Sequence, residues 1–280
     1  MNRSIITATN TMSQLQKQID NISNNIANVN TTGYKSREAN FSELLYQNFN
    51  NQQRTDKEIG RLTPHGIRYG TGAKLGHTNV NYGIGNITKT DRLLDVALSN
   101  PSQFFRIGVQ TDAATVEYRA TRDGSFHLSP TADNSNMLEL VTSSGHSVVD
   151  PNGQKILVPA DYKQVTFRPD GSIFVTDKNG ITTQNQLSIF HFDKPQLLES
   201  KGDNTYDLPF NLQELGYNEN DIARVINPNE GSLVQGSLEQ SNVDLSSEMT
   251  NLVMTQRSYQ FNARAITLSD EMMGMINNIR

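Results

Sequence analysis

Five histidines are the first candidates for metal binding or acid–base chemistry in this sequence: His65, His77, His127, His146 and His191. They are scattered, and no two of them have the spacing that places both rings on one face of a helix. The chain has no cysteine, which excludes disulfides and thiolate zinc sites. We therefore expect no metal site and no bound cofactor.

Two acidic turns and one glycine-rich stretch also resemble known chemical motifs. Residues 150–153 and 177–180 faintly resemble calcium loops, but they lack the alternating ligands and the distal Glu. Residues 66–76 have neither the Gly-Lys-Ser/Thr ending of a phosphate-binding loop nor a strand before it. No nucleophile elbow is present. These observations predict a non-enzymatic protein without catalytic residues.

The composition limits the partners that the chain can have. Apolar residues make up 35% and charged residues only 19%, so uncharged polar residues, Asn and Gln above all, are abundant. A net charge of −5 and the lack of a basic run argue against nucleic acid. No run of about 18 apolar residues is present, so we expect no membrane insertion. The N-terminus lacks a secretory apolar region, and the absence of cysteine fits either a cytosolic protein or one exported unfolded.

The elements that would carry function are helices at the two ends of the chain. From residue 2 to residue 30, apolar residues recur every seven positions in two rows offset by three, as at the a and d positions of a coiled coil. Few charges lie beside these rows, which favours neighbours on several sides; a helix packed only on its own core is the alternative. Gly33 suits the left-handed position that ends such a helix.

A second helix is predicted over residues 238–280, with Asn242 or Asp244 as its N-cap. Eight apolar seam residues contribute about 10–25 kcal/mol when buried, whereas ordering about 30 residues costs about 30–60 kcal/mol of backbone entropy. Helical hydrogen bonds offset only part of this difference. We therefore expect the two helices to pair with each other and with other copies, and to be disordered in the free monomer.

Between the helices, short strands alternate with turns. Strands are predicted at residues 104–107, 138–141, 164–167, 172–175 and 187–190, with Asp-Gly, Ser-Gly and Asn-Gly turns between them. Residues 122–126 and 168–173 share an Asp-Gly-Ser-apolar pattern, which predicts two hairpins. The expected fold class is α+β, with a small all-β central domain and N- and C-terminal helices that pair in a coiled-coil-like manner on assembly.

Five segments follow from these patterns. They are an N-terminal assembly helix (1–35), an extended or irregular connector (36–95), a β-rich domain (96–205), a second connector (206–237) and a C-terminal assembly helix (238–280).

Both ends carry long recognisable motifs. Residues 25–35, Asn-Ile-Ala-Asn-Val-Asn-Thr-Thr-Gly-Tyr-Lys, resemble the N-terminal signature of flagellar rod and hook proteins, and residues 236–245, Gly-Ser-Leu-Glu-Gln-Ser-Asn-Val-Asp-Leu, resemble their C-terminal motif. Residues 42–47 continue as in rod proteins. The chain therefore resembles the flagellar rod and hook–basal-body family, most closely its distal-rod type. The motif residues are Asn25, Ala27, Asn28, Asn30, Thr31, Gly33, Tyr34, Lys35, Ser241, Asn242, Val243, Asp244, Gln256, Arg257, Asn262 and Ala263.

One stretch departs from the family pattern. Asn100-Pro101-Ser102-Gln103 stands where the family has a Gly-x-Gly sequence, so the local turn must differ.

The resemblance implies a structural subunit of the flagellar rod that polymerises through its terminal helices into an axial tube, which transmits torque and forms the export channel. The implied partners are other copies, other rod and hook proteins and the flagellar type III export apparatus, and the implied location is the basal body, outside the cytoplasm. A hook-like or proximal-rod component is one alternative. An exported cell-wall-acting enzyme or carbohydrate-binding module is an alternative of another class.

The heptads predict an assembly interface on both helices. Its residues are Ile5, Met12, Leu15, Ile19, Ile22, Ile26, Val29, Leu245, Met249, Leu252, Tyr259, Ala263, Ile266, Met273 and Ile276. Isolated charges in these helices are either solvent-exposed or form ion pairs between subunits that fix the register. These charges are Asp20, Glu248, Arg257, Arg264 and Asp270.

Overall fold

A computed structural model describes residues 2–44, 46–49, 67–70, 72–110, 116–131, 136–178, 180–209, 216, 222–225 and 232–278. His65, Asn179 and most of the second predicted connector lie outside these residues. The chain divides into two compact units. Unit 1 combines Met1–Ile26, Arg37–Asn79 and Leu245–Arg280, and unit 2 combines Ala27–Ser36 and Val80–Asp244. The predicted division into five segments stays a prediction.

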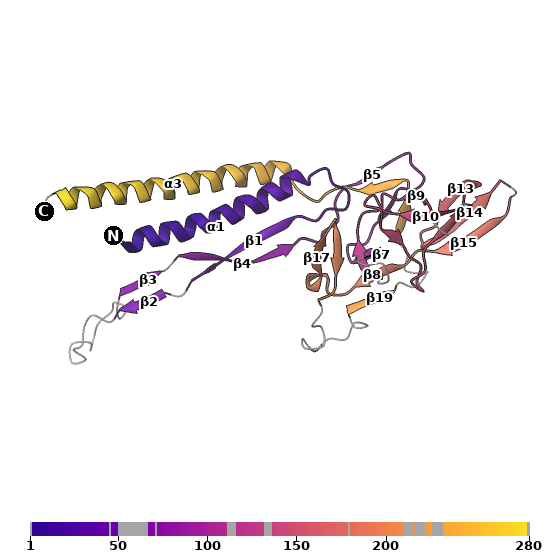
Figure 1. Cartoon of the computed structure of the whole chain (residues 1–280), viewed down its shortest axis with the longest axis horizontal. Coiled ribbons are helices and arrows are strands. Elements are labelled where there is room, and N and C mark those ends of the chain that lie inside the picture. Colours follow the sequence, from indigo (N-terminus) through magenta and orange to yellow (C-terminus); the bar gives the residue numbers. More distant parts are fainter. Residues whose placement is uncertain are drawn as a thin grey trace. The chain divides into compact units, whose positions relative to one another are not determined.

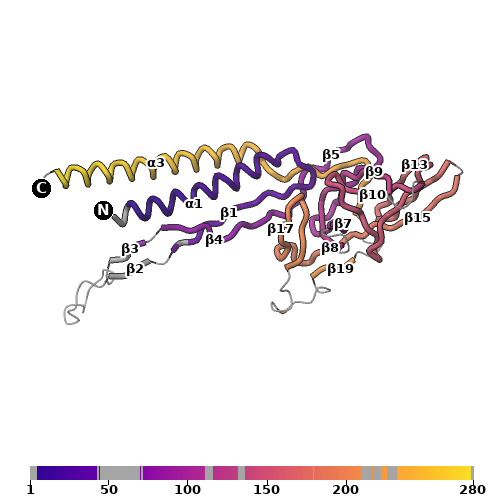
Figure 2. Tube along the Cα trace, viewed as in Figure 1, coloured from indigo at the N-terminus to yellow at the C-terminus, as the bar shows by residue number. Residues whose placement is uncertain are grey.

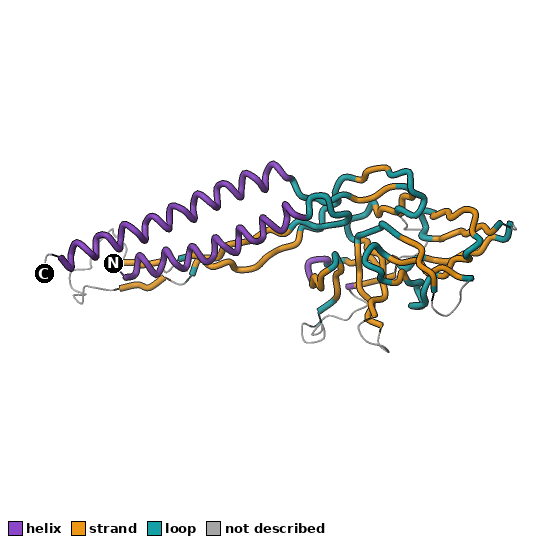
Figure 3. The backbone as a smooth tube through the Cα atoms, turned by 45° about the horizontal axis from the view of Figure 1, so that its top comes forward, coloured by secondary structure: helices purple, strands orange, loops and turns teal. Residues whose placement is uncertain are grey.

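Unit 1 contains two long helices, α1 (Asn2–Ala27) and α3 (Leu245–Asn278), which lie side by side (Figures 1 and 3). The N- and C-termini lie at the same end of this unit (Figure 2). Strand β1 (Arg37–Glu43) pairs with β4 (Ala73–Val80), and β2 (Tyr46–Phe49) pairs antiparallel with β3 (Ile67–Gly70).

Uncharged polar side chains of α1 bond to the backbone of these strands. The amide NH₂ of Asn21 donates to the carbonyl of Arg37 at 3.0 Å. The side-chain oxygen of Gln14 accepts from the Leu75 N–H at 2.9 Å. A charged side chain in these places would be costly to bury unpaired, whereas an amide is satisfied by a single backbone group. One neighbour of α1 is therefore a strand pair of the same chain.

The C-terminal helix begins at Leu245, so its predicted start at residue 238 is wrong. Residues 237–239 form strand β21 (Ser237–Glu239), which pairs antiparallel with β5 (Ile87–Lys89). The Gln240 N–H then donates to the Asn86 carbonyl. These backbone bonds hold the segment extended until Asp244, which directly precedes the helix.

Unit 2 is built on a ten-stranded antiparallel sheet with the strand order β12-β10-β11-β7-β8-β18-β17; β16 also pairs with β7 and β19, and β9 with β10. The strands are β7 (Gln103–Gln110), β8 (Val116–Thr121), β9 (His127–Pro130), β10 (Met137–Val141), β11 (Ser147–Val148), β12 (Leu157–Pro159), β16 (Ile189–Phe192), β17 (Glu199–Gly202), β18 (Thr205–Asp207) and β19 (Ala223–Val225). A 3₁₀ turn, η2 (Pro195–Leu197), follows β16.

Besides the pair of β21 and β5, two smaller sheets are present in the described part of unit 2. Strands β13 (Tyr162–Phe167), β14 (Ser172–Asp177) and β15 (Thr182–Gln186) form an antiparallel sheet in that order. Strand β20 (Leu233–Gln235) pairs with β6 (Val96–Leu98). The helices at both ends and the mostly β middle confirm the α+β fold class.

Successive residues of β7 point into different hydrophobic cores, as expected for a strand buried on both faces. Phe105 packs in the larger core with Phe126, and Phe104 packs in the smaller core with Phe192 and Tyr206. The strands predicted at residues 104–107, 138–141, 164–167 and 172–175 are confirmed as parts of β7, β10, β13 and β14. The fifth begins at Ile189 rather than at residue 187.

Only one of the two predicted hairpins forms. Residues 168–173 connect β13 to β14, and Gly171 has the left-handed φ of 83° that this turn requires. Residues 122–126 form no hairpin, because β8 pairs with β7 and β18 while β9 pairs with β10. Instead Gly124 lies against the backbone of β6, and its carbonyl accepts from the Val96 N–H at 3.0 Å.

This close approach predicts that Gly124→Ala destabilises unit 2 by about 3 kcal/mol or more, because a Cβ at this position would lie 1.7 Å from the Val96 carbonyl oxygen. Gly274→Ala is the control: apart from the adjoining backbone of α3 itself, no atom lies within 4 Å of where its Cβ would be, so the change should cost nothing and should favour the helix by up to about 1 kcal/mol. Urea unfolding followed by circular dichroism measures both effects. Equal free energies of unfolding for the two variants would contradict this account of the turn.

Candidate functional site

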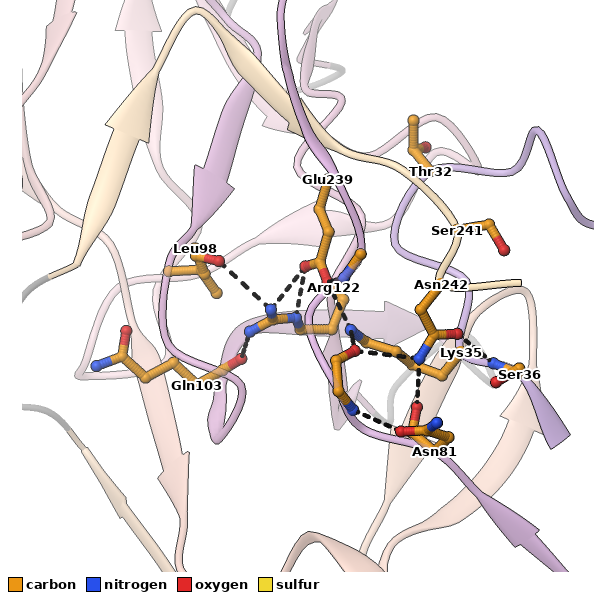
Figure 4. A network of polar contacts seen from close by, with 12 residues as sticks. Thr32, Lys35, Ser36, Asn81, Leu98, Gln103, Arg122, Glu239, Ser241 and Asn242 are labelled. Atoms are coloured by element: carbon orange, nitrogen blue, oxygen red, sulfur yellow. Dashed lines mark hydrogen bonds and ion pairs between the residues drawn. The ribbon is translucent and has the colours of Figure 1, made fainter. Parts of the chain in front are cut away.

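Glu239 is the centre of a buried charged cluster in unit 2 (Figure 4). It ends β21, whereas Lys35 follows the turn after α1 and Arg122 follows β8. The Lys35 ammonium nitrogen lies 2.5 Å from Glu239 Oε1, and Arg122 Nη2 lies 2.6 Å from Glu239 Oε2. All three side chains are at most 1% exposed. Segments from the beginning, the middle and the end of the chain therefore meet at one carboxylate.

Backbone groups satisfy the remaining hydrogen-bonding capacity of the cluster. Lys35 Nζ also donates to the Gly83 carbonyl at 2.7 Å, and the Gly85 N–H donates to Glu239 Oε1 at 3.0 Å. Such additional hydrogen bonds are what make a buried ionic cluster tolerable in a folded protein.

Arg122 also binds the stretch that departs from the family pattern. Its Nη1 donates to the carbonyls of Asn100, at 2.7 Å, and Gln103, at 2.5 Å. Any residue type supplies a backbone carbonyl. The guanidinium can therefore hold this turn although the expected glycines are absent.

The cluster contains two cations and only one anion, and this imbalance affects their protonation. Burial, with repulsion from Arg122 as the second cause, lowers the pKa of Lys35 from 10.5 to about 8, against the opposing attraction of Glu239. Burial also lowers the pKa of Arg122. Of the two cations, Lys35 therefore releases its proton first as the pH rises.

Asn242 links the two terminal motifs within unit 2. Its side-chain oxygen accepts from the Ser36 N–H at 2.7 Å, and its NH₂ donates to the carbonyls of Asn81, at 2.8 Å, and Gly83, at 3.1 Å. Of the two predicted N-caps of the C-terminal helix, Asn242 is therefore excluded, because its amide is engaged elsewhere, whereas Asp244 directly precedes the first residue of α3.

Gly33 brings the N-terminal motif against Arg122. It has a φ of 66°, and its N–H donates to the Glu239 carbonyl at 2.8 Å. A Cβ at this position would lie 2.6 Å from the Arg122 carbonyl carbon. The predicted left-handed conformation is confirmed, and steric contact is a second reason for a glycine here.

Asn25 plays a similar joining role in unit 1. Its NH₂ donates to the Arg37 carbonyl at 2.9 Å and to Glu248 Oε1 at 3.0 Å, and its oxygen accepts from the Arg37 N–H at 3.0 Å. Asn25 thus links α1 to β1 and to the first turn of α3. The isolated charge of Glu248 is engaged within the chain, whereas Asp20, Arg257, Arg264 and Asp270 are exposed.

The predicted interface residues differ in exposure. Ile22 is buried; Ile5, Met12, Leu15, Ile19, Ile26, Val29, Leu252, Tyr259, Ala263, Ile266 and Met273 are half-buried; Leu245, Met249 and Ile276 are exposed. Most of these residues therefore already face their own chain in part, and their role between subunits stays a prediction.

The motif residues likewise divide by exposure. Asn25, Gly33, Tyr34 and Lys35 are buried; Asn28, Thr31, Ser241, Asn242, Val243, Asn262 and Ala263 are half-buried; Ala27, Asn30, Asp244, Gln256 and Arg257 are exposed. The sequence analysis missed the partnership of Arg122 with Glu239. The available signal was chemical, because Lys35 is the one charged residue of the N-terminal motif and Glu239 is one of only two charged residues in the C-terminal motif.

The sequence analysis also missed a third heptad row, the outer row, which consists of Met254, Phe261, Leu268 and Met275 of α3. These side chains are 58%, 74%, 59% and 59% exposed. Their spacing of seven was visible in the sequence. The structure therefore separates two apolar rows on α3, one turned partly inward and one open.

Across the described residues, no three His, Asp or Glu side chains lie together in a way that could hold a metal ion. In the same part of the chain, no helix combines the length and apolar character needed to cross a membrane.

The cluster predicts that Glu239→Gln destabilises unit 2 by about 3–5 kcal/mol, because it leaves two buried cations without their anion. Glu199→Gln makes the same chemical change in the exposed pair with Lys201 and should cost less than about 1 kcal/mol. Urea unfolding of the full chain compares the two variants. Similar losses of unfolding free energy in the two variants would show that the buried ion pairs of Glu239 contribute no more to stability than an exposed pair does.

The lowered pKa of Lys35 predicts a specific pH dependence. Between pH 8 and pH 10.5 the unfolded chain keeps a proton on Lys35 that the folded chain has released. Stability therefore increases with pH in this interval and is lost as the pH falls through it. Relative to Lys35→Met, the free energy of unfolding of the unmodified chain should increase by up to about 3 kcal/mol.

Urea unfolding at several pH values measures this difference. Lys163→Met, which removes an exposed lysine of β13, is the control and should follow the unmodified chain. If the free energy of unfolding changed with pH in the same way in the unmodified chain and in Lys35→Met, the lowered pKa of Lys35 would be contradicted.

Comparison with known proteins places these motifs in a family. Residues 5–35 match the family described as "Flagella basal body rod protein", and residues 234–279 match "Flagellar basal body rod FlgEFG protein C-terminal". The chain is 40% identical to the flagellar hook-basal body complex protein FlhP of Bacillus subtilis, with both chains covered completely. It is 35% identical to the flagellar basal-body rod protein FlgG of Borreliella burgdorferi, over 100% of this chain and 99% of the relative. It is 30% identical to FlgG of Bacillus subtilis, again over both full lengths. The chain belongs to the flagellar basal-body rod family, and within it to the distal-rod type.

Proposed function

We propose that this chain is a structural, non-enzymatic subunit of the bacterial flagellar rod and that it polymerises through its terminal helices. The outer row of α3 is the observation that carries the proposal. Its four large apolar side chains recur every seven residues and are more than half exposed. Monomeric soluble proteins rarely leave a regular apolar stripe of this kind uncovered.

The outer row has the pattern of a coiled-coil seam. Ser258, Ala265 and Met272 lie between its members, so the intervals alternate between four and three residues as at d and a positions. Small residues at two of these positions let a second helix approach closely. The half-buried row of Leu252, Tyr259, Ile266 and Met273 faces the chain's own unit, so α3 has apolar rows for both its own chain and a neighbour.

The energy of this contact is large enough to drive assembly. Burying four such side chains contributes about 1.5–3 kcal/mol each, or about 6–12 kcal/mol for each copy. Exposed charges lie beside the row at Arg257, Arg264 and Glu271. Such charges add little affinity, but they favour particular partners and registers.

The names of the relatives and the features of the chain support the wider proposal. The subunits would form an axial tube that transmits torque and encloses the export channel, with other rod and hook proteins as neighbours, in the basal body. Export through the flagellar type III apparatus is favoured by the lack of cysteine and by a charged cluster that forms only when distant segments have folded together.

The proposal also concerns where along the axis of the rod and hook this subunit is placed. Identity to the hook-basal body complex protein of Bacillus subtilis is 40%, against 30% to the rod protein FlgG of the same organism. This difference favours a diverged paralogue beside the main distal-rod subunit over a hook-like or proximal-rod component. Electron microscopy of flagellar bases from a deletion strain distinguishes these positions, and complete rods in that strain would count against a rod subunit.

The outer row predicts that Phe261→Gln combined with Leu268→Gln prevents polymerisation and leaves unit 2 folded, because both side chains belong to α3 of unit 1 and are exposed in the single chain. Ile181→Gln removes an apolar side chain of unit 2 that is also exposed and should leave assembly unchanged. Sedimentation velocity and negative-stain microscopy of the purified proteins measure assembly. Tubes formed by the double variant would exclude the outer row as the contact.

The sequence-based expectation that both helices are disordered in the free monomer stays a prediction. Hydrogen exchange of the monomeric double variant tests it. Rapid exchange in α1 and α3, with protection in β7 and β14, is the expected result. Protection of both helices equal to that of the sheet would show that they need no partner to fold.

A further inference from the structure

Strand β15 is an outer strand of unit 2, at one end of the sheet β13-β14-β15 (Figure 1). Its sequence, Thr-Thr-Gln-Asn-Gln, contains no charge and no proline. The side chains of residues 182–184 are exposed. An outer strand presents backbone N–H and C=O groups to which another strand can pair, and proteins commonly prevent this with lysines, prolines or bulges. The sequence of β15 contains none of these residues.

The outer strands of the ten-stranded sheet differ from β15 in this respect. Strands β9 and β12 contain proline, which has no N–H to donate, whereas β17 and β19 contain a cation that is costly to cover. These residues are Pro130, Pro159, Lys201 and Arg224. Each of these four edges therefore discourages the addition of a strand.

Strand β13, at the other end of the three-stranded sheet, is protected in two ways. Its pairing with β14 shifts register near Lys163. The side chain of Gln235 also occupies its edge: the side-chain oxygen accepts from the Phe167 N–H at 3.2 Å, and the NH₂ donates to the Val165 carbonyl at 3.0 Å. Among the outer strands of these two sheets, as far as the structure describes them, β15 alone has no such protection.

The pairing of β15 with β14 decides which backbone groups of β15 are open. Just after β15, the Leu187 N–H donates to the Gly171 carbonyl at 2.8 Å, so these two residues form a hydrogen-bonded pair. Bonded and non-bonded pairs alternate along antiparallel strands. By this alternation and the register of β15 on β14, the backbone groups of Thr182, Gln184 and Gln186 point away from the sheet.

Side chains at the end of β15 anchor the strand to its own unit. The Asn185 NH₂ donates to the Leu157 carbonyl at 3.0 Å. The Gln186 NH₂ donates to the Asp170 carbonyl at 2.9 Å, and its oxygen accepts from the Ser172 hydroxyl at 3.0 Å. A strand that is ordered in advance loses little conformational entropy when it pairs.

We propose that β15 pairs with β15 of a second copy of this chain, antiparallel and about a twofold axis. Gln184 then lies opposite the partner's Gln184, and Thr182 lies opposite the partner's Gln186. Outward-pointing residues thus meet only outward-pointing residues, so each pair exchanges two backbone hydrogen bonds. The strand has no charge that would repel its copy, and its Thr, Asn and Gln side chains form favourable cross-strand pairs. These properties make β15 complementary to itself.

This contact is isologous, so it joins two copies and does not extend into a tube. It belongs to unit 2 and does not depend on the proposed polymerisation through α3. Because the paired strands have only five residues each, the contact is small and the dimer is transient. A measurement of this dimer must therefore trap it.

Disulfide trapping tests the proposal, because the chain has no cysteine of its own. In the proposed pairing the two Gln184 Cα atoms lie about 5.5 Å apart, which a disulfide can span. Gln184→Cys should therefore give a covalent dimer under mild oxidation, measured by non-reducing electrophoresis. Thr182→Cys is the matched control, because residue 182 of the partner lies about 13 Å away along the strands. It should give at least about tenfold less dimer, since that distance is too long for a disulfide.

A mixture of Thr182→Cys and Gln186→Cys chains tests the register, because these positions lie opposite each other and should form a mixed dimer. Adding Gln184→Lys to both chains places two lysines face to face and should lower the yield at least about tenfold. Gln164→Lys, which adds the same charge to exposed β13, is the control and should leave the yield unchanged.

Three results would overturn the pairing of β15 with itself: little dimer from Gln184→Cys, equal dimer from Thr182→Cys, or a mixed dimer that Gln184→Lys does not reduce. The first result would leave β15 open to a strand of another protein. The second would indicate random collision or a parallel arrangement. Circular dichroism verifies that each variant is folded.

Discussion

The buried carboxylate of Glu239 imposes the strongest constraint on this molecule. It accepts hydrogen bonds from Lys35 and Arg122, which stand 204 and 117 residues away in the sequence. A charge removed from water is tolerated only when its partners are all in place. The segment that follows α1 and the segment that leads from β21 toward α3 must therefore fold together with the middle of the chain. Residues that approach this cluster closely, such as Gly33, are restricted by the same requirement.

Helix α1 is held in unit 1 by hydrogen bonds of side-chain amides rather than by buried ion pairs. Asn25 alone bonds to β1 and to Glu248 of α3. Amide bonds orient α1 without placing charges on its apolar faces. The outer row of α3 takes no part in these bonds and is exposed, as the proposed contact with a neighbouring copy requires.

In unit 2, the contacts of Arg122 explain how a turn can form from a sequence that differs from the family pattern. Arg122 holds the Asn100–Gln103 turn through backbone carbonyls, so the turn keeps its place without the glycines of related proteins. The sheet beyond it needs only two apolar cores, one on each side of β7.

The sequence by itself determined the features that depend on local order. Heptad spacing predicted both helices, strand and turn patterns predicted β7, β10, β13 and β14, and the two terminal motifs indicated the family. Tertiary structure decided the rest. Residues 122–126 and 168–173 share one local pattern, yet only the second forms a hairpin, because the first lies against the Val96 carbonyl. Two apolar rows of α3 have the same period, and only packing decides which one is open. The partners of Glu239 come from distant segments, and no local pattern specifies a contact that chain folding alone creates.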